Sequence, residues 1–153
     1  MMTLTNRFKA DDVITQTASG LAGEHIAAAS VLGRGWRVSM SQQDAVDLIA
    51  WHPDTGQMLR IQVKSCQAAR QGQGHRDRRV HFQTGLGGRK RLPSIKDYDI
   101  LACVSADQRA VWYIPVVSIN TKKYTRPCSF FEDPHLESDS WANCLKVLQD
   151  VRR

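Results

Sequence analysis

Four polar residues occupy positions where the surrounding sequence favours apolar side chains. Glu24 lies within the Ala-rich stretch GLAGEHIAAASVL, and Asp47 interrupts the apolar run at 46–51. Gln62 and Lys64 share one face of the alternating segment that follows. Burying a carboxylate is costly unless it is paired or binds a metal ion. These residue types and positions therefore predict a polar site within the core.

The chemistry that suits this set is phosphodiester hydrolysis. That reaction needs positive charge beside the phosphate and an activated water, and a divalent cation with oxygen ligands supplies both. Glu24 and Asp47 would provide carboxylate oxygens, Gln62 an amide oxygen and Val63 its backbone carbonyl. Lys64 would orient the water or help to deprotonate it, and would stabilise charge in the transition state. All-oxygen ligands favour Mg²⁺ or Mn²⁺ over zinc.

The predicted secondary structure can bring these residues together. The turn sequence HPDTG joins two β-like segments, so we expect a hairpin that places Asp47 near Gln62 and Lys64. A helix packed over that hairpin would add Glu24. The predicted elements are a helix at 19–32, strands at 36–41, 46–51, 58–65, 80–83, 100–105 and 110–115, and a C-terminal helix from residue 138 capped by Ser138 or Asp139.

Positive charge is concentrated in one part of the chain. Residues 60–96 hold ten lysines and arginines against a single acid, Asp77, a net charge of +9 that leaves −3 for the rest of the +6 chain. A local patch of this sign favours a phosphate-bearing partner, although a solubilising surface would have a similar composition. The candidate nucleic-acid-binding residues are Arg76, Arg78, Arg79, Arg89, Lys90 and Arg91.

The ordered motifs resemble those of the PD-(D/E)XK, or restriction-endonuclease-like, nuclease superfamily. The resemblance rests on GEHIAAASVLGRGW at 23–36, DAVDLIA at 44–50, LRIQVKS at 59–65, DYDILACV at 97–104 and VWYIPV at 111–116. It is closest to group I intron-associated homing endonucleases and extends to archaeal Holliday-junction resolvases. Val46 stands where the name of the superfamily has proline, and Gln62 replaces the usual acid. The second departure removes a negative charge, which favours one tightly held ion.

This resemblance implies a fold, an activity and partners. The fold would be an α/β restriction-endonuclease-like core, with a central mixed β-sheet of four or five strands flanked by helices. The activity would be Mg²⁺-dependent DNA cleavage that leaves a 5′-phosphate and a 3′-hydroxyl, of the homing type that cuts both strands. The alternatives are junction resolution and a catalytically inactive DNA-binding subunit. Cutting both strands calls for two active sites, so we expect a homo-oligomer, a dimer or tetramer.

Chain length and composition set the remaining expectations. The 153 residues fit one nuclease domain, with a loose N-terminal arm at 1–15, the nuclease core at 20–119 and the C-terminal helix at 138–151. The acidic Asp97 and Asp99 precede a predicted strand, where we expect them to cap the strand or to support the site residues. No apolar stretch approaches membrane-spanning length, and the N-terminus lacks signal-peptide features, so we expect no membrane partner and a cytoplasmic location.

Overall fold

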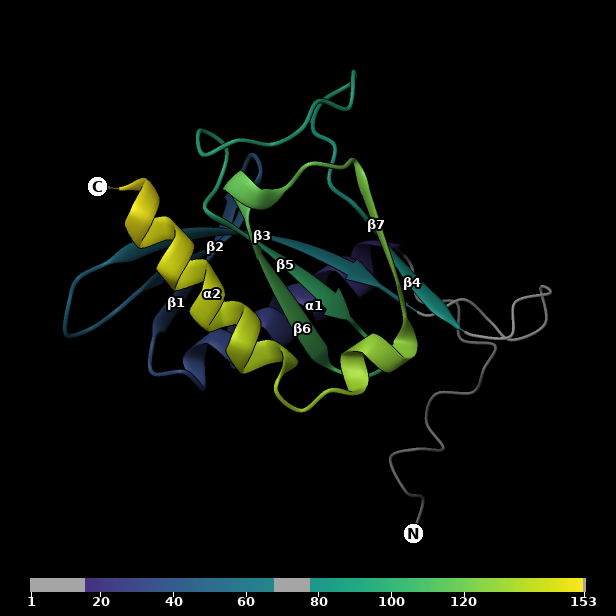
Figure 1. Ribbon diagram of the computed structural model, residues 1–153, viewed down its shortest axis with the longest axis horizontal. Helices are drawn as coiled ribbons and strands as arrows, with labels where there is room; N and C mark the ends of the chain where they lie inside the picture. Colours follow the sequence, from purple (N-terminus) through teal and green to yellow (C-terminus); the bar gives the residue numbers. More distant parts are fainter. Residues whose placement is uncertain (1–15, 68–77, 153) are drawn as a thin grey trace, which may run out of the picture.

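A five-stranded mixed sheet forms the centre of the protein. The computed structural model describes residues 16–67 and 78–152, and the arm at 1–15 lies outside them. The strand order is β1-β2-β3-β5-β6, with β3 and β5 parallel and all other neighbours antiparallel. The predicted central mixed sheet is therefore confirmed (Figure 1). The strands are β1 (Arg37–Gln43), β2 (Val46–Trp51), β3 (Met58–Cys66), β5 (Ile100–Ser105) and β6 (Ala110–Pro115).

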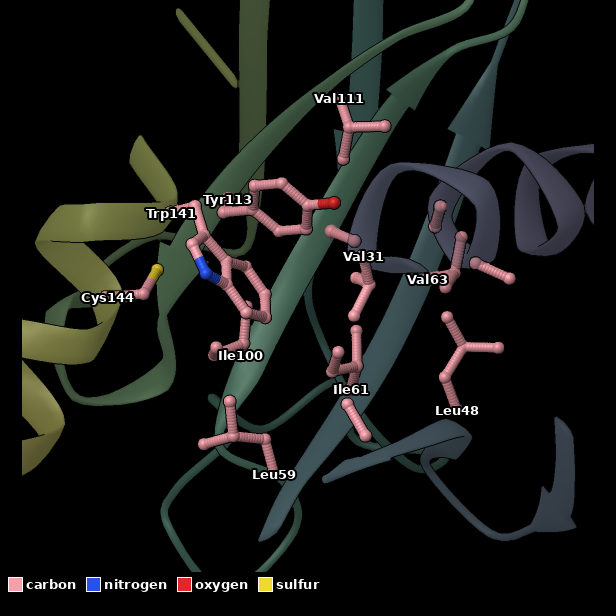
Figure 2. Packing of buried hydrophobic residues seen from close by; sticks show 14 of the residues in the cluster. Val31, Leu48, Leu59, Ile61, Val63, Ile100, Val111, Tyr113, Trp141 and Cys144 are labelled. Atoms are coloured by element: carbon pink, nitrogen blue, oxygen red, sulfur yellow. The ribbon is translucent and has the colours of Figure 1, made fainter. Parts of the chain in front are cut away.

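Both helices cover the same face of this sheet. The helix α1 (Gln16–Leu32) and the helix α2 (Leu136–Val151) bury Val31 and Trp141 in one apolar cluster with Ile61 and Tyr113. Figure 2 shows this packing, with Trp141 beside Tyr113 and Val31 over β3. Alternation along β3 explains the arrangement, because its apolar side chains face the helices while Arg60, Gln62 and Lys64 face the other way.

A second, two-stranded sheet covers the opposite face. The strands β4 (Arg79–Gln83) and β7 (Lys123–Pro127) pair only with each other, in antiparallel register. The inner side chains of β4 join a separate apolar cluster that also contains Leu101 and Ile114 of the main sheet. The sequence pattern missed β7 and the two short 3-10 helices, η2 (Val116–Ser118) and η3 (Cys128–Glu132).

The start of the C-terminal helix differs from the expectation. Ser138 or Asp139 was expected to cap it, but both lie inside α2, whose N-cap is His135, and the His135 side chain forms no capping bond. The helix begins earlier because its first turn is fixed by packing and by a polar contact with α1. There Ser30 donates to the carboxylate of Glu137 and accepts from the Tyr113 hydroxyl of β6, at 2.6 Å.

Asp99 joins the start of the parallel strand pair to Arg152, which directly follows α2. Its buried carboxylate accepts from the backbone N–H of Arg60 at 2.7 Å and forms ion pairs with Arg60 and Arg152 at 3.3 and 3.5 Å. The expected local structural role of this aspartate is confirmed. None of the described helices has the length and apolarity needed to cross a membrane.

A glycine in α1 sets how closely that helix approaches β3. A Cβ built on Gly23 would lie 2.5 Å from Cβ and 2.7 Å from Oγ of Ser65, distances that atoms of these kinds do not tolerate. Only hydrogen at this position lets the helix rest against the strand. Because Glu24 is the next residue, this contact also fixes the distance of its carboxylate from the sheet.

We predict that Gly23→Ala lowers the free energy of unfolding by about 1–3 kcal/mol, because the added methyl group overpacks the α1–β3 contact. Gly20→Ala is the matched control: nothing lies within 4 Å of its Cβ, and alanine is the better helix former by roughly 1 kcal/mol. The double variant Gly23→Ala, Ser65→Gly removes both colliding atoms and should recover the loss. Urea unfolding measures all three, and a Gly23→Ala protein as stable as Gly20→Ala would contradict the packing argument.

Candidate metal-binding and catalytic site

Asp47 joins β2 to β3 where their main-chain pairing stops. The ladder between the two strands reaches Leu48 opposite Ile61 and goes no further. One carboxylate oxygen of Asp47, Oδ2, accepts from the backbone N–H of Val63 at 2.7 Å and from Nε2 of Gln62 at 2.9 Å. The side chain thus takes the place of a strand carbonyl. Two strong bonds on one oxygen hold this carboxylate in a single orientation.

Gln62 has an acceptor without a partner. Its side chain is buried, Nε2 donates to Asp47, and Oε1 lies inside the protein with no hydrogen bond to any described residue. The orientation of the amide follows from its neighbour, because a carboxylate oxygen requires the N–H side of the glutamine. An unsatisfied buried acceptor costs about 1–3 kcal/mol, and proteins rarely keep one without a reason. Oε1 is therefore an oxygen free to bind a cation.

Glu24 brings a second carboxylate to Asp47. Burial raises the pKa of Glu24 above its ordinary value of 4.5, and the negative charge of Asp47 and a hydrogen bond with it raise the pKa further. The neighbouring His25 acts in the opposite direction. Two carboxyl groups in contact cannot both ionise without cost unless a proton or a cation lies between them. The structure therefore brings Glu24, Asp47 and Gln62 together, as the sequence predicted.

The donor set fits a hard divalent cation. Among residues 16–67 and 78–152 no group of three or more His, Cys, Asp or Glu side chains gathers as a metal site. The available ligands are instead two carboxylates, the free Oε1 of Gln62 and the carbonyl of Val63. That carbonyl lies on the same strand edge as the Val63 N–H, and so faces Asp47. Oxygen atoms of these kinds suit Mg²⁺ or Mn²⁺.

Lys64 lies two residues along β3 from Gln62, on the same face of the strand. It is half-buried and stands opposite Cys103 of β5 in the parallel pair. Burial raises the pKa of the Cys103 thiol, and the positive charges of Arg126 and Lys64 lower it in part, so the ammonium group lies close by. In the described part of the chain Lys64 forms no ion pair. The structure gives no direct contact between Lys64 and Asp47 or Glu24.

The basic residues fall into separate groups. Arg89 and Lys90 are exposed at a loop tip, and their side chains form no hydrogen bond or ion pair with the described residues. Arg91, by contrast, binds Asp97 through two bonds of 2.7 and 2.9 Å, which lower the pKa of Asp97 to about 2. Asp97 also accepts from the backbone N–H of Ser94, which confirms its capping role.

The two arginines at the start of β4 are exposed, and Arg76 lies outside the described residues. Arg78 pairs with Asp107 at 3.6 Å, whereas Arg79 has no side-chain partner among the described residues. Arg79, Arg89 and Lys90 are thus the members of the predicted basic set whose charge is open to an external anion.

Sequence reasoning did not predict that Gly23 packs against Ser65, a contact that sets how closely α1 approaches β3. A glycine inside an Ala-rich helix was the available signal, because glycine costs about 1 kcal/mol relative to alanine there. Ser65 gave no comparable signal. Its hydroxyl is buried and has no hydrogen-bond partner in the described part of the chain, and it lies directly against the helix turn that carries Glu24.

One comparison with known proteins bears on this arrangement. No model of a known protein family matches the sequence, and no curated protein matches it. Among solved structures, a bacterial homing endonuclease, I-Ssp6803I, is similar with a TM-score of 0.58, at 15% sequence identity, over 74% of this chain and 78% of its own. At a sequence identity of 15%, this similarity shows a shared fold alone. The chain therefore shares its overall architecture with a homing endonuclease.

Proposed function

We propose that this protein is a divalent-metal-dependent endonuclease that hydrolyses phosphodiester bonds in DNA. The observation that carries the proposal is the contact between the Glu24 and Asp47 carboxyl groups beside the unpartnered Oε1 of Gln62. The repulsion between Glu24 and Asp47 and the buried Oε1 of Gln62 both cost stability, and a bound cation would offset both costs. The fold shared with a homing endonuclease and the exposed arginines support DNA as the substrate.

Each residue has a distinct part in the reaction. When bound, Mg²⁺ or Mn²⁺ would supply positive charge at the scissile phosphate and polarise water. Asp47, Glu24, Gln62 and the Val63 carbonyl would hold it. Asp47 is fixed in advance by its bonds to Val63 and Gln62, so little reorganisation is needed on binding.

Lys64 would act on the charge that develops during attack. Its ammonium group lies beyond Gln62 on β3 and has no acidic partner among the described residues, so its charge is available to a phosphate oxygen or to the attacking water. The products would be a 5′-phosphate and a 3′-hydroxyl. Because residues 16–67 and 78–152 form one such site, we also propose that duplex cleavage of the homing type uses a symmetric homo-oligomer, a dimer or tetramer.

The raised pKa of Glu24 leads to a prediction for the metal-free protein. A carboxyl whose pKa is higher in the folded state stabilises the fold most below pH 4.5, and this contribution is lost as the pH rises through the folded pKa. We therefore expect Glu24→Gln to raise Tm at pH 7 in the presence of a chelator, by roughly 2–4 °C for each kcal/mol of relief. Below pH 4 the difference from wild type should vanish.

The same pair of proteins reports on metal binding. Added Mg²⁺ or Mn²⁺ should raise Tm of the wild type more than that of Glu24→Gln, because a ligand that binds only the folded state stabilises it. The control is Glu132→Gln, a change at an exposed glutamate away from the site. Thermal unfolding followed by circular dichroism measures both effects. A Glu24→Gln protein less stable than wild type without metal would show that Glu24 is a structural residue.

Substitutions at Asp47 and Lys64 test the activity itself. Asp47→Asn can keep both hydrogen bonds, since they share one oxygen, but it loses the charge. Lys64→Ala removes the ammonium group. We expect each to reduce Mg²⁺-dependent cleavage by about 10²-fold or more, because both act on charge that develops in the transition state. Binding to duplex DNA should remain.

The assay uses linear duplex, four-way junction and single-stranded DNA, with gel analysis of products. Lys146→Ala and Asp150→Asn, exposed changes of the same types on α2, are the matched controls and should cut as the wild type does. Preference for the junction would favour a resolvase. Wild-type protein that binds DNA but cuts none of the three substrates with Mg²⁺ or Mn²⁺ would identify a DNA-binding subunit and contradict the proposal.

A further inference from the structure

The β4–β7 ribbon, residues 79–83 and 123–127, has one face anchored in the core. Val80 and Phe82 are buried, and the Phe82 ring packs against Phe131 at 6.0 Å between centroids. On the same face of β7, the guanidinium of Arg126 lies 4.7 Å from the centre of the Trp112 ring. A ribbon held in this way presents its other face in a fixed orientation.

The outer face of the ribbon is made of polar and basic side chains. The register places Thr125 opposite His81 and Lys123 opposite Gln83, and cross-strand partners share a face. His81 Nδ1 and Thr125 Oγ1 lie 3.0 Å apart, which confirms that these two side chains meet there. Arg79, at the start of β4, completes this face.

The chemistry of this face differs from that of an ordinary solvated strand. The ribbon contains neither Asp nor Glu, although an exposed surface usually mixes both signs. The side chains of Arg79, Gln83 and Lys123 are exposed and form no hydrogen bond or ion pair with the described residues. Guanidinium, amide and ammonium groups are the types that read the edges of bases in DNA.

The ribbon also lies beside the candidate catalytic site. The sulfur of Cys66, at the end of β3, accepts from the backbone N–H of His81 at 3.3 Å. Cys66 follows Lys64 by two residues, roughly 7 Å along the strand. Figure 1 shows β4 and β7 side by side, far from the C-terminal end of α2. DNA with a phosphate at Lys64 would therefore pass next to the ribbon.

We propose that the outer face of the β4–β7 ribbon enters the major groove of the DNA and reads base edges close to the cleaved bond. This inference rests on the proposed function and adds to it the element that selects sequence. The major groove accepts a two-stranded ribbon, and glutamine pairs with adenine as arginine or lysine pairs with guanine. Arg89 and Lys90, on their separate loop, contact phosphate and carry no sequence information.

The experiment selects bound molecules from a pool of duplexes of random sequence, using the full chain with Ca²⁺ in place of Mg²⁺. Sequencing of the bound fraction gives the preferred bases, and titration at several salt concentrations gives the electrostatic contribution. Gln83→Ala should lose preference at one base pair, by roughly tenfold, while the salt dependence stays unchanged because glutamine is uncharged. Gln149→Ala, an exposed glutamine on α2, should change neither.

Two further variants separate the contribution of phosphate contacts from that of base reading. The double variant Arg89→Ala, Lys90→Ala should keep the preferred bases but lower the slope of log affinity against log salt by about 0.9 for each lost phosphate contact. Gln83→Glu keeps the shape of the side chain and should shift the favoured base towards cytosine.

The inference is overturned if the wild type binds duplexes without base preference. It is also overturned if Gln83→Ala and Lys123→Ala bind and retain the wild-type pattern. Failure of the wild type to bind any duplex would instead remove the proposed function on which the inference rests.

Discussion

The site depends on one hydrogen bond, in which the Asp47 carboxylate accepts from the backbone N–H of Val63. This bond forms where the β2–β3 ladder ends at Leu48 and Ile61. Beyond that pair, the Asp47 side chain accepts the hydrogen bond that a backbone carbonyl would accept in a regular ladder. Gln62 and Glu24 reach Asp47 there, from β3 and from α1. If the main-chain ladder continued past Leu48, a backbone carbonyl of β2 would accept from the Val63 N–H in place of the Asp47 carboxylate.

The resulting cluster of Glu24, Asp47 and Gln62 lowers the stability of the fold, and its oxygen atoms are suited to binding a cation. Glu24 and Asp47 repel each other, and the buried Oε1 of Gln62 has no donor among the residues that the structure describes. Local rules that favour a satisfied, apolar core are broken at three neighbouring positions, a pattern typical of functional sites. The helix α1 can bring its carboxylate this close because Gly23 lies against Ser65. The packing of Gly23 against Ser65 and the clustered carboxylates thus both support the interpretation of this sheet edge as a binding site.

The sequence predicted the elements that carry the site better than those that surround it. Strict alternation in β3 and the HPDTG turn located the β2–β3 hairpin, and Asp47 was visible because it interrupts an apolar strand. The meeting of Glu24 with Asp47 depends on how α1 packs, which periodicity alone does not determine. The strand β7 was missed because its sequence KYTRP is short, has Tyr124 as its one apolar residue before the final proline, and so shows no apolar alternation. Its pairing with β4 is a long-range contact without a local signal.

The most direct test of this account is the location of a bound divalent cation. Crystals of the protein grown with Mn²⁺ would show the ion by its anomalous scattering. The account predicts one strong peak between Asp47 and Glu24, within about 2.0–2.3 Å of carboxylate oxygens, with Oε1 of Gln62 and the Val63 carbonyl around it. A peak elsewhere, or none at this edge while the Glu24 and Asp47 carboxyl groups stay in contact through a shared proton, would contradict it.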